Sequence, residues 1–168
     1  EPSVLESKPQ WPGREHRDAF VRSVCVYKGD VYAAGEDRMD EDEGTLKIWK
    51  NGLKTTDMLP PGTPGSGFDI SVYQGDVYMV SYYYDFENDQ DVIKLWKNGS
   101  STDLLESGSF GHVNSLHVNN GDTYVAGSIM SSWQYFGRFW KNGQPVEGIE
   151  NMEKARFNSV FADNGDVY

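Results

Sequence analysis

Two short motifs recur along the chain with a nearly constant spacing. Trp-Lys-Asn-Gly occurs three times, with tryptophans 47 and 44 residues apart, at Trp49, Trp96 and Trp140. Gly-Asp-Xaa-Tyr occurs four times, with tyrosines 46, 46 and 44 residues apart, at Tyr32, Tyr78, Tyr124 and Tyr168. Because two independent markers share one period, the chain is predicted to consist of stacked structural repeats.

Each repeat is predicted to contain four short strands. Alternating apolar residues identify the first strand, for example Val24 and Val26 in the first repeat and Ile70 and Val72 in the second. A Gly-Asp turn leads to a second strand beginning Val-Tyr or Thr-Tyr, and the third strand ends at the repeated tryptophan. The fourth strand follows an Asn-Gly pair. The 18 glycines and the 14% aromatic content agree with many short strands and tight turns.

The Trp-Lys-Asn-Gly motif has a structural explanation. Asn-Gly is the preferred two-residue hairpin turn, because both positions need a positive φ that these residues tolerate. Asn51, Asn98 and Asn142 are therefore interpreted as turn residues, and the tryptophans as large side chains that pack one sheet on the next. The alternative is a repeated ligand site built from Trp and Lys, which the motif does not require.

A four-stranded antiparallel unit of about 45 residues with Trp at the end of its third strand is typical of a β-propeller blade. The sequence resembles the propeller repeats of bacterial surface and secreted proteins that read "VYVAG…LWKNG", and its layout is similar to WD-type and kelch blades. The resemblance covers about residues 20–168 and implies an all-β propeller fold. It implies no single activity, because fold alone does not specify function.

The period divides the chain into an N-terminal strand and loop at 1–19, three full blades at 20–67, 68–111 and 112–156, and two strands of a partial blade at 157–168. The stretch at 3–7 is predicted to be an orphan fourth strand. Propellers usually close with about four to eight blades. The sequence leaves three possibilities open: a segment of a longer or engineered propeller, a ring completed by self-association, and a small irregular four-bladed ring.

Composition excludes several classes of partner. A net charge of -11 argues against nucleic acid and against anionic membrane surfaces. No apolar run is long enough for a transmembrane helix, and the single cysteine, Cys25, permits no intrachain disulfide. The chain begins at Glu1 with no signal peptide, which favours a mature form or an excised segment and leaves the compartment unknown.

The predicted loops differ strongly between the two ends of the repeats. The turns between first and second strands, and between third and fourth strands, are short and uniform, whereas the remaining loops vary in every repeat. Variable loops on an invariant scaffold are typical of a binding surface. The aromatic candidates on that surface are Tyr83, Tyr84, Trp133 and Tyr135, whereas Tyr82 is expected to be packed. Such side chains suit a sugar ring or a protein partner.

The acidic loops offer a weak calcium motif, with Asp40, Asp42, Asp85 and Asp89 as candidate ligands. Neither loop has the spacing of an EF-hand, and the third repeat lacks equivalent acids. A solvated acidic hairpin is therefore favoured, and no metal site and no cofactor are predicted.

Enzymatic interpretations depend on a single carboxylate. The predicted positions facing a central channel are Ser23, Asp69, Ser115 and Ser159, whereas a glycosidase needs two carboxyl groups. The sequence therefore predicts a binding or scaffolding module, not an enzyme, that contacts a glycan or a protein. The alternatives are a portion of an extracellular carbohydrate-active enzyme with Asp69 near its channel, and a self-assembling propeller segment without a ligand. The resemblance favours an extracellular location.

Overall fold

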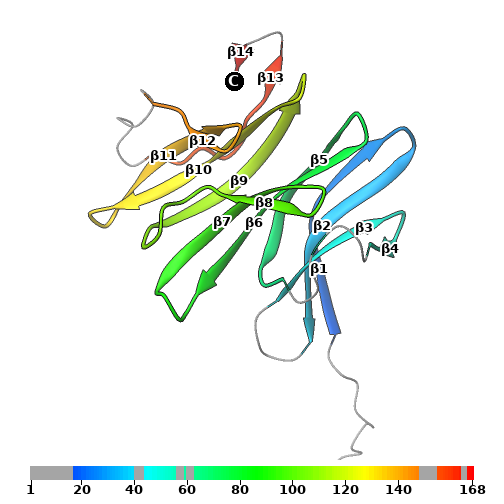
Figure 1. Cartoon of the computed structure of the whole chain (residues 1–168), viewed down its shortest axis with the longest axis horizontal. Helices are drawn as coiled ribbons and strands as arrows, with labels where there is room; N and C mark the ends of the chain where they lie inside the picture. Colours follow the sequence, from blue (N-terminus) through cyan, green and yellow to red (C-terminus); the bar gives the residue numbers. More distant parts are fainter. Residues whose placement is uncertain (1–16, 40–43, 56–58, 60–62, 148–154, 164–165) are drawn as a thin grey trace, which may run out of the picture.

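The computed structural model describes residues 17–39, 44–55, 59, 63–147, 155–163 and 166–168, and every regular element among them is a β-strand. The strands form three four-stranded sheets and a two-stranded pair (Figure 1). Each four-stranded sheet is an antiparallel meander, in which strands consecutive in the chain are hydrogen-bonded neighbours. The described residues are therefore all-β, as predicted. The orphan strand predicted at 3–7 lies outside the described residues.

The sheets follow the sequence repeat. The first sheet contains β1 (Arg17–Tyr27), β2 (Asp30–Met39), β3 (Thr45–Lys50) and β4 (Leu53–Lys54). The second contains β5 (Ser66–Tyr73), β6 (Asp76–Asp85), β7 (Gln90–Lys97) and β8 (Ser100–Asp103). The third contains β9 (Phe110–Asn119), β10 (Asp122–Ser131), β11 (Gln134–Lys141) and β12 (Gln144–Pro145). The pair is β13 (Ala162–Asp163) with β14 (Asp166–Val167).

The first strand of each sheet contains a β-bulge at an equivalent position. The pairing register skips Arg22 in β1, Phe68 in β5 and Asn114 in β9. An extra residue of this kind breaks the alternation from which a strand is recognised in sequence. These strands begin at Arg17, Ser66 and Phe110, two or three residues before the residues at which the blades were divided in the sequence.

Two-residue turns with the same backbone conformation join the strands at seven places: the six turns of the repeated motifs, and Ser132-Trp133 between β10 and β11. At each turn both residues have a positive φ, as the Asn-Gly pairs predict for Asn51, Asn98 and Asn142. The turns between first and second strands are Lys28-Gly29, Gln74-Gly75 and Asn120-Gly121. The expectation of a Gly-Asp turn at these three places is wrong by one residue, because the aspartate is the first residue of the following strand.

The two repeated motifs meet in a polar cluster that we call the clamp. In the second sheet, the Asn98 side-chain oxygen accepts a hydrogen bond from the Val77 amide at 2.9 Å, and its amide group donates to Asp76 at 2.7 Å. Lys97 pairs with Asp76 at 2.9 Å and lies over the Tyr78 ring, 5.1 Å from its centre. The same contacts recur in the first and third sheets, at Asp30, Val31, Tyr32, Lys50 and Asn51 and at Asp122, Thr123, Tyr124, Lys141 and Asn142. The clamp fixes one hairpin turn to the start of the strand beside it.

The sheets pack face to face, and each junction uses the same positions. We call the face that carries the repeated tyrosine the front face, and the face that carries the repeated tryptophan the back face. The front face of the first sheet packs on the back face of the second through Tyr32, Ala34, Leu46 and Ile48 against Ile70, Val77, Met79 and Trp96. The second packs on the third through Tyr78, Val80, Ile93 and Leu95 against Leu116, Val118, Val125 and Trp140. The third packs on the next segment through Tyr124, Ala126 and Phe139 against Val160 and Ala162.

The Asp69 carboxylate connects all three sheets. One oxygen accepts hydrogen bonds from the Ser23 hydroxyl at 2.7 Å and from the Ile70 amide at 2.9 Å. The other accepts from the Leu116 amide, in the third sheet, at 2.7 Å. Ser115 has a similar role in the following repeat, because its hydroxyl accepts from the Val160 amide at 3.3 Å. This position therefore ties the first strand of one sheet to the first strand of the next.

Replacing Asp69 tests this connection. We expect Asp69→Ala to lower the free energy of unfolding by about 2 kcal/mol or more, because three donors lose a charged acceptor. Asp69→Ser should lose less, since a serine hydroxyl serves as the acceptor at Ser115. Urea unfolding followed by circular dichroism measures both values. A serine variant as unstable as the alanine variant would contradict this account.

The clamp predicts a specific dependence of stability on pH. Hydrogen bonds from Lys97 and then Asn98 hold the pKa of Asp76 below its ordinary value of 3.8. The ionised form is thus favoured in the folded state, so the stabilisation is complete above pH 3.8 and is lost as the pH falls through the lowered pKa. Asp76→Asn should unfold at lower urea than the native chain at neutral pH, with a difference that shrinks below pH 3.8. A difference that stays constant on acidification would refute this assignment.

Candidate functional site

The variable loops lie at the end of the sheets opposite the uniform turns. Figure 1 shows the tips of the β6–β7 and β10–β11 hairpins on one side of the molecule, away from the turns that join β5 to β6 and β9 to β10. We call the side with the hairpin tips the loop face. Tyr82, Tyr83 and Tyr84 lie in the loop-face half of β6, and Tyr135 lies near the start of β11.

Four aromatic rings, with an arginine at each end, form a row of contacting side chains that runs across the sheets; we call it the ring row. The Phe68 and Tyr82 ring centres are 6.0 Å apart in an edge-on arrangement, and Tyr82 lies 5.3 Å from His112. His112 is stacked with Tyr135 at 6.1 Å. An arginine lies at each end of the ring row: Arg22 lies 5.2 Å from the Phe68 ring centre, and Arg156 lies 4.0 Å from the Tyr135 ring centre. It therefore connects the first sheet to the segment after the third sheet.

A groove of about 240 Å³ lies beside the ring row, between the first and second sheets. Its aromatic lining comes from Phe68, Tyr82, Tyr83, Tyr84 and Phe86. Its remaining lining residues are Arg22, Glu36, Gly44, Gly65 and Ser66. We call this the aromatic groove. It joins apolar ring surface to a pair of opposite charges, which is a combination typical of small-ligand sites.

The charged end of the aromatic groove is held by short polar contacts. The Arg22 guanidinium donates from Nε to the Ser66 hydroxyl at 2.6 Å and lies 3.5 Å from the Glu36 carboxylate. Glu36 is only 3% exposed, whereas the Arg22 side chain is partly open to solvent. A β-carbon at Gly44 would come within 3.0 Å of that carboxylate. Glycine at this position therefore keeps space around the buried acid.

The aromatic end is held by the β6–β7 hairpin. The Tyr82 hydroxyl donates to Asp91 at 2.7 Å, and the other Asp91 oxygen accepts from the Gly111 amide at 2.8 Å. Burial, and then this hydrogen bond, raises the pKa of Tyr82, so its hydroxyl stays protonated as a donor. Tyr84 donates to Asp89 and makes an edge-on contact with Phe86, with ring centres 4.8 Å apart. The ring positions are thus set by contacts within the hairpin and with β9.

The sequence-predicted aromatic residues occupy different places. Tyr83 and Tyr84 line the aromatic groove, together with Tyr82, for which the sequence predicts packing alone. Tyr82 does both, since it also packs against the core between the second and third sheets. Tyr135 belongs to the ring row and lies at the end that is farther from the groove. Trp133 is 92% exposed at the tip of the β10–β11 hairpin.

The acidic candidates for calcium have local partners. One Asp85 oxygen accepts from the Glu87 and Asn88 amides at 3.1 and 3.3 Å, and the other accepts from the Asn88 side chain at 2.8 Å. Asp89 accepts from Tyr84. Asp40 and Asp42 lie outside the described residues. Among the side chains that the structure describes, no group of three or more His, Cys, Asp and Glu is placed to hold a metal ion.

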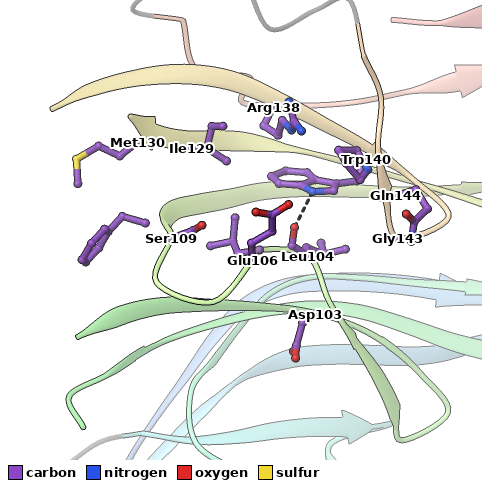
Figure 2. A pocket seen from close by; sticks show the side chains of 13 residues that line it. Asp103, Leu104, Glu106, Ser109, Ile129, Met130, Arg138, Trp140, Gly143 and Gln144 are labelled. Carbon is purple, nitrogen blue, oxygen red and sulfur yellow. Dashed lines mark hydrogen bonds between the residues drawn. The ribbon is translucent and has the colours of Figure 1, made fainter. Parts of the chain in front are cut away.

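A second hollow, of about 420 Å³, lies between the outer strands of the second and third sheets (Figure 2). The Trp140 indole N–H points into it and donates to the Leu104 carbonyl at 2.9 Å. Ile129 and Met130 lie on one wall, and Asp103 lies at the opposite side. The ring that could best contact a ligand here already uses its polar group to join two sheets. The aromatic groove is therefore the stronger candidate site.

No family model, no curated protein and no solved structure matches this chain. Within the described ranges, no helix is long and apolar enough to cross a membrane.

Several groove residues are absent from the sequence-based candidates. Arg22 and Phe68 occupy the bulge positions, and Glu36 lies in the strand facing Arg22. A signal is present in the sequence, because aligned repeats place Arg22, Phe68 and Asn114 at the same position with three different chemistries. Variation at one position of an otherwise regular strand indicates a local role.

The hydrogen bond between Tyr82 and Asp91 gives a test of groove rigidity. We expect Tyr82→Phe to lower the free energy of unfolding by about 1 kcal/mol, since Asp91 loses a half-buried donor while the ring packing remains. Tyr84→Phe, which removes a more exposed hydroxyl, is the matched control and should cost less. Urea unfolding measures both. Equal effects would contradict the assigned role of Tyr82.

Proposed function

We propose that the chain is a set of β-propeller blades that acts as a binding module, and that the aromatic groove holds a neutral glycan. The propeller arrangement is supported by three consecutive four-stranded meanders whose first strands neighbour one another, with β5 beside β1 and β9 beside β5. The equivalence of the packing positions at every junction supports it further. Such an arrangement carries variable loops on one face.

The observation that carries the binding proposal is the composition of the aromatic groove. Tyr83, Tyr84 and Phe86 offer ring surface on which the apolar face of a sugar can lie. Arg22 and Glu36 supply a donor and an acceptor for sugar hydroxyls at the other end. At about 240 Å³ the groove is smaller than a typical drug-sized pocket, so it suits one ring of a longer chain. The net charge of -11 disfavours an acidic glycan.

The enzymatic alternative gains no support from the geometry. Both oxygens of Asp69 accept hydrogen bonds that join neighbouring sheets, so the carboxylate has a structural task. Acid and base catalysis of glycoside hydrolysis also needs a second carboxyl group near the first. The other first-strand residues at this position are Ser23 and Ser115, and both take part in the same inter-sheet contacts.

Calorimetric titration with a panel of neutral hexose and pentose oligosaccharides tests this proposal. An oligosaccharide that binds the native chain should bind the Tyr84→Ala variant about tenfold more weakly, because the variant removes ring surface from the groove. This loss corresponds to about 1.4 kcal/mol of binding free energy. Trp133→Ala is the matched control, since it removes an exposed aromatic residue from another region of the loop face. Binding that depends on Trp133 and not on Tyr84, or no binding by any neutral oligosaccharide, would overturn the assignment.

A further inference from the structure

The back face of the first sheet is apolar and open. Val24, Val26 and Val31 are 60%, 69% and 41% exposed there. At the equivalent positions of the second and third sheets, the apolar residues are covered by a neighbouring front face, and Ile70 and Val118 are only 3% and 7% exposed. Trp49 is half-buried, whereas Trp96 and Trp140 are buried. The first sheet therefore presents the same packing surface as its neighbours, and no sheet of the described residues covers it.

The complementary surface lies at the other end of the described chain. Tyr168 occupies the position of Tyr32, Tyr78 and Tyr124, each of which is buried in a front face. Tyr168 is 74% exposed, and its ring centre is 6.5 Å from that of Phe161, which is also exposed. Figure 1 shows the β13–β14 pair and the first sheet separated by the second and third sheets. The described residues thus include both halves of an inter-sheet junction, and no described strand covers either half.

We propose that these two surfaces bind each other between copies of this chain, head to tail. The front face of the β13–β14 pair, with Phe161 and Tyr168, would cover Val24, Val26 and Val31 of a second copy. This mode repeats the front-to-back junctions already formed inside the molecule. A back-to-back dimer of first sheets would lack the tyrosine that each of those junctions uses.

The polar contacts of two internal junctions support the same pairing. Asp69 accepts from the Leu116 amide, and Ser115 accepts from the Val160 amide, whereas at the junction of the first and second sheets the Ser23 hydroxyl donates to Asp69. In the head-to-tail pair, the equivalent acceptor is the exposed Ser159 and the equivalent amide is that of Val24. Such an interface is heterologous, so it forms either a closed ring or an open chain of copies.

Light scattering behind a sizing column, over a wide range of concentrations, tests the proposal. We expect the native chain to exceed the single-chain mass of 19.0 kDa and to increase in mass with concentration. Added salt should strengthen the association, because each copy carries a net charge of -11. A mass of 19.0 kDa at every concentration would overturn the proposal.

Two charge substitutions identify the surfaces. Val26→Lys blocks the back face and Tyr168→Lys blocks the front face, and both positions are exposed in the single chain, so each variant should fold. Each alone should have a mass of 19.0 kDa, whereas their mixture should form a one-to-one pair because each retains one intact surface. Ser101→Lys, on exposed β8, is the matched control and should associate like the native chain.

The mixing experiment also excludes the other arrangements. A back-to-back dimer would be lost in Val26→Lys and kept in Tyr168→Lys, and either that result or a failure of the mixture to associate would overturn head-to-tail pairing. The outcome is independent of glycan binding, because Val26 and Tyr168 do not line the aromatic groove. Failure of the two proposals can therefore be told apart.

Discussion

Packing of a front face on a back face is the interaction on which the rest of this structure depends. A four-stranded meander has two faces, and in this chain both are apolar, so no repeat can shield its own side chains from water. The second sheet is covered on both sides, through Ile70 and Met79 towards the first sheet and Val80 and Leu95 towards the third. The same requirement explains why the outermost surfaces of the described chain are the ones left apolar and open.

The polar groups of the repeat restrict how the sheets can stack. Each clamp ties a turn to the adjacent strand on one side of the molecule, and Asp69 and Ser115 tie the first strands together near the bulges. Because these contacts fix the sheets relative to one another, the loops at the opposite ends of the strands can differ between repeats while the packing of the sheets stays the same. The aromatic groove lies at those ends, where Arg22 and Tyr84 come from different sheets.

The features that arise from local structure could be predicted from the sequence. The repeat period and the all-β class could be read from the sequence. The positive φ at Asn51, Asn98 and Asn142 could be predicted as well, because turn conformation depends on adjacent residues. Only part of the role of the lysine and asparagine in Trp-Lys-Asn-Gly could be predicted from the sequence: the turn was predicted, and the contact with the aspartate was not. Their partner Asp76 lies 22 residues before Asn98, and the pairing becomes visible only when the strands are in register.

The sequence by itself determined which segments become strands and turns, and that each repeat needs a neighbour on either face. Both follow from alternation, periodicity and the conformational preference of a few residues. Only the tertiary structure decided that Asp69 joins Ser23 to Leu116, and that Arg22, Glu36 and Tyr84 surround one groove. The Asp69 contacts join residues about one repeat apart, and the groove combines side chains of two sheets. The geometry of both is set by sheet packing and by the bulges at Arg22 and Phe68, which no local pattern specifies.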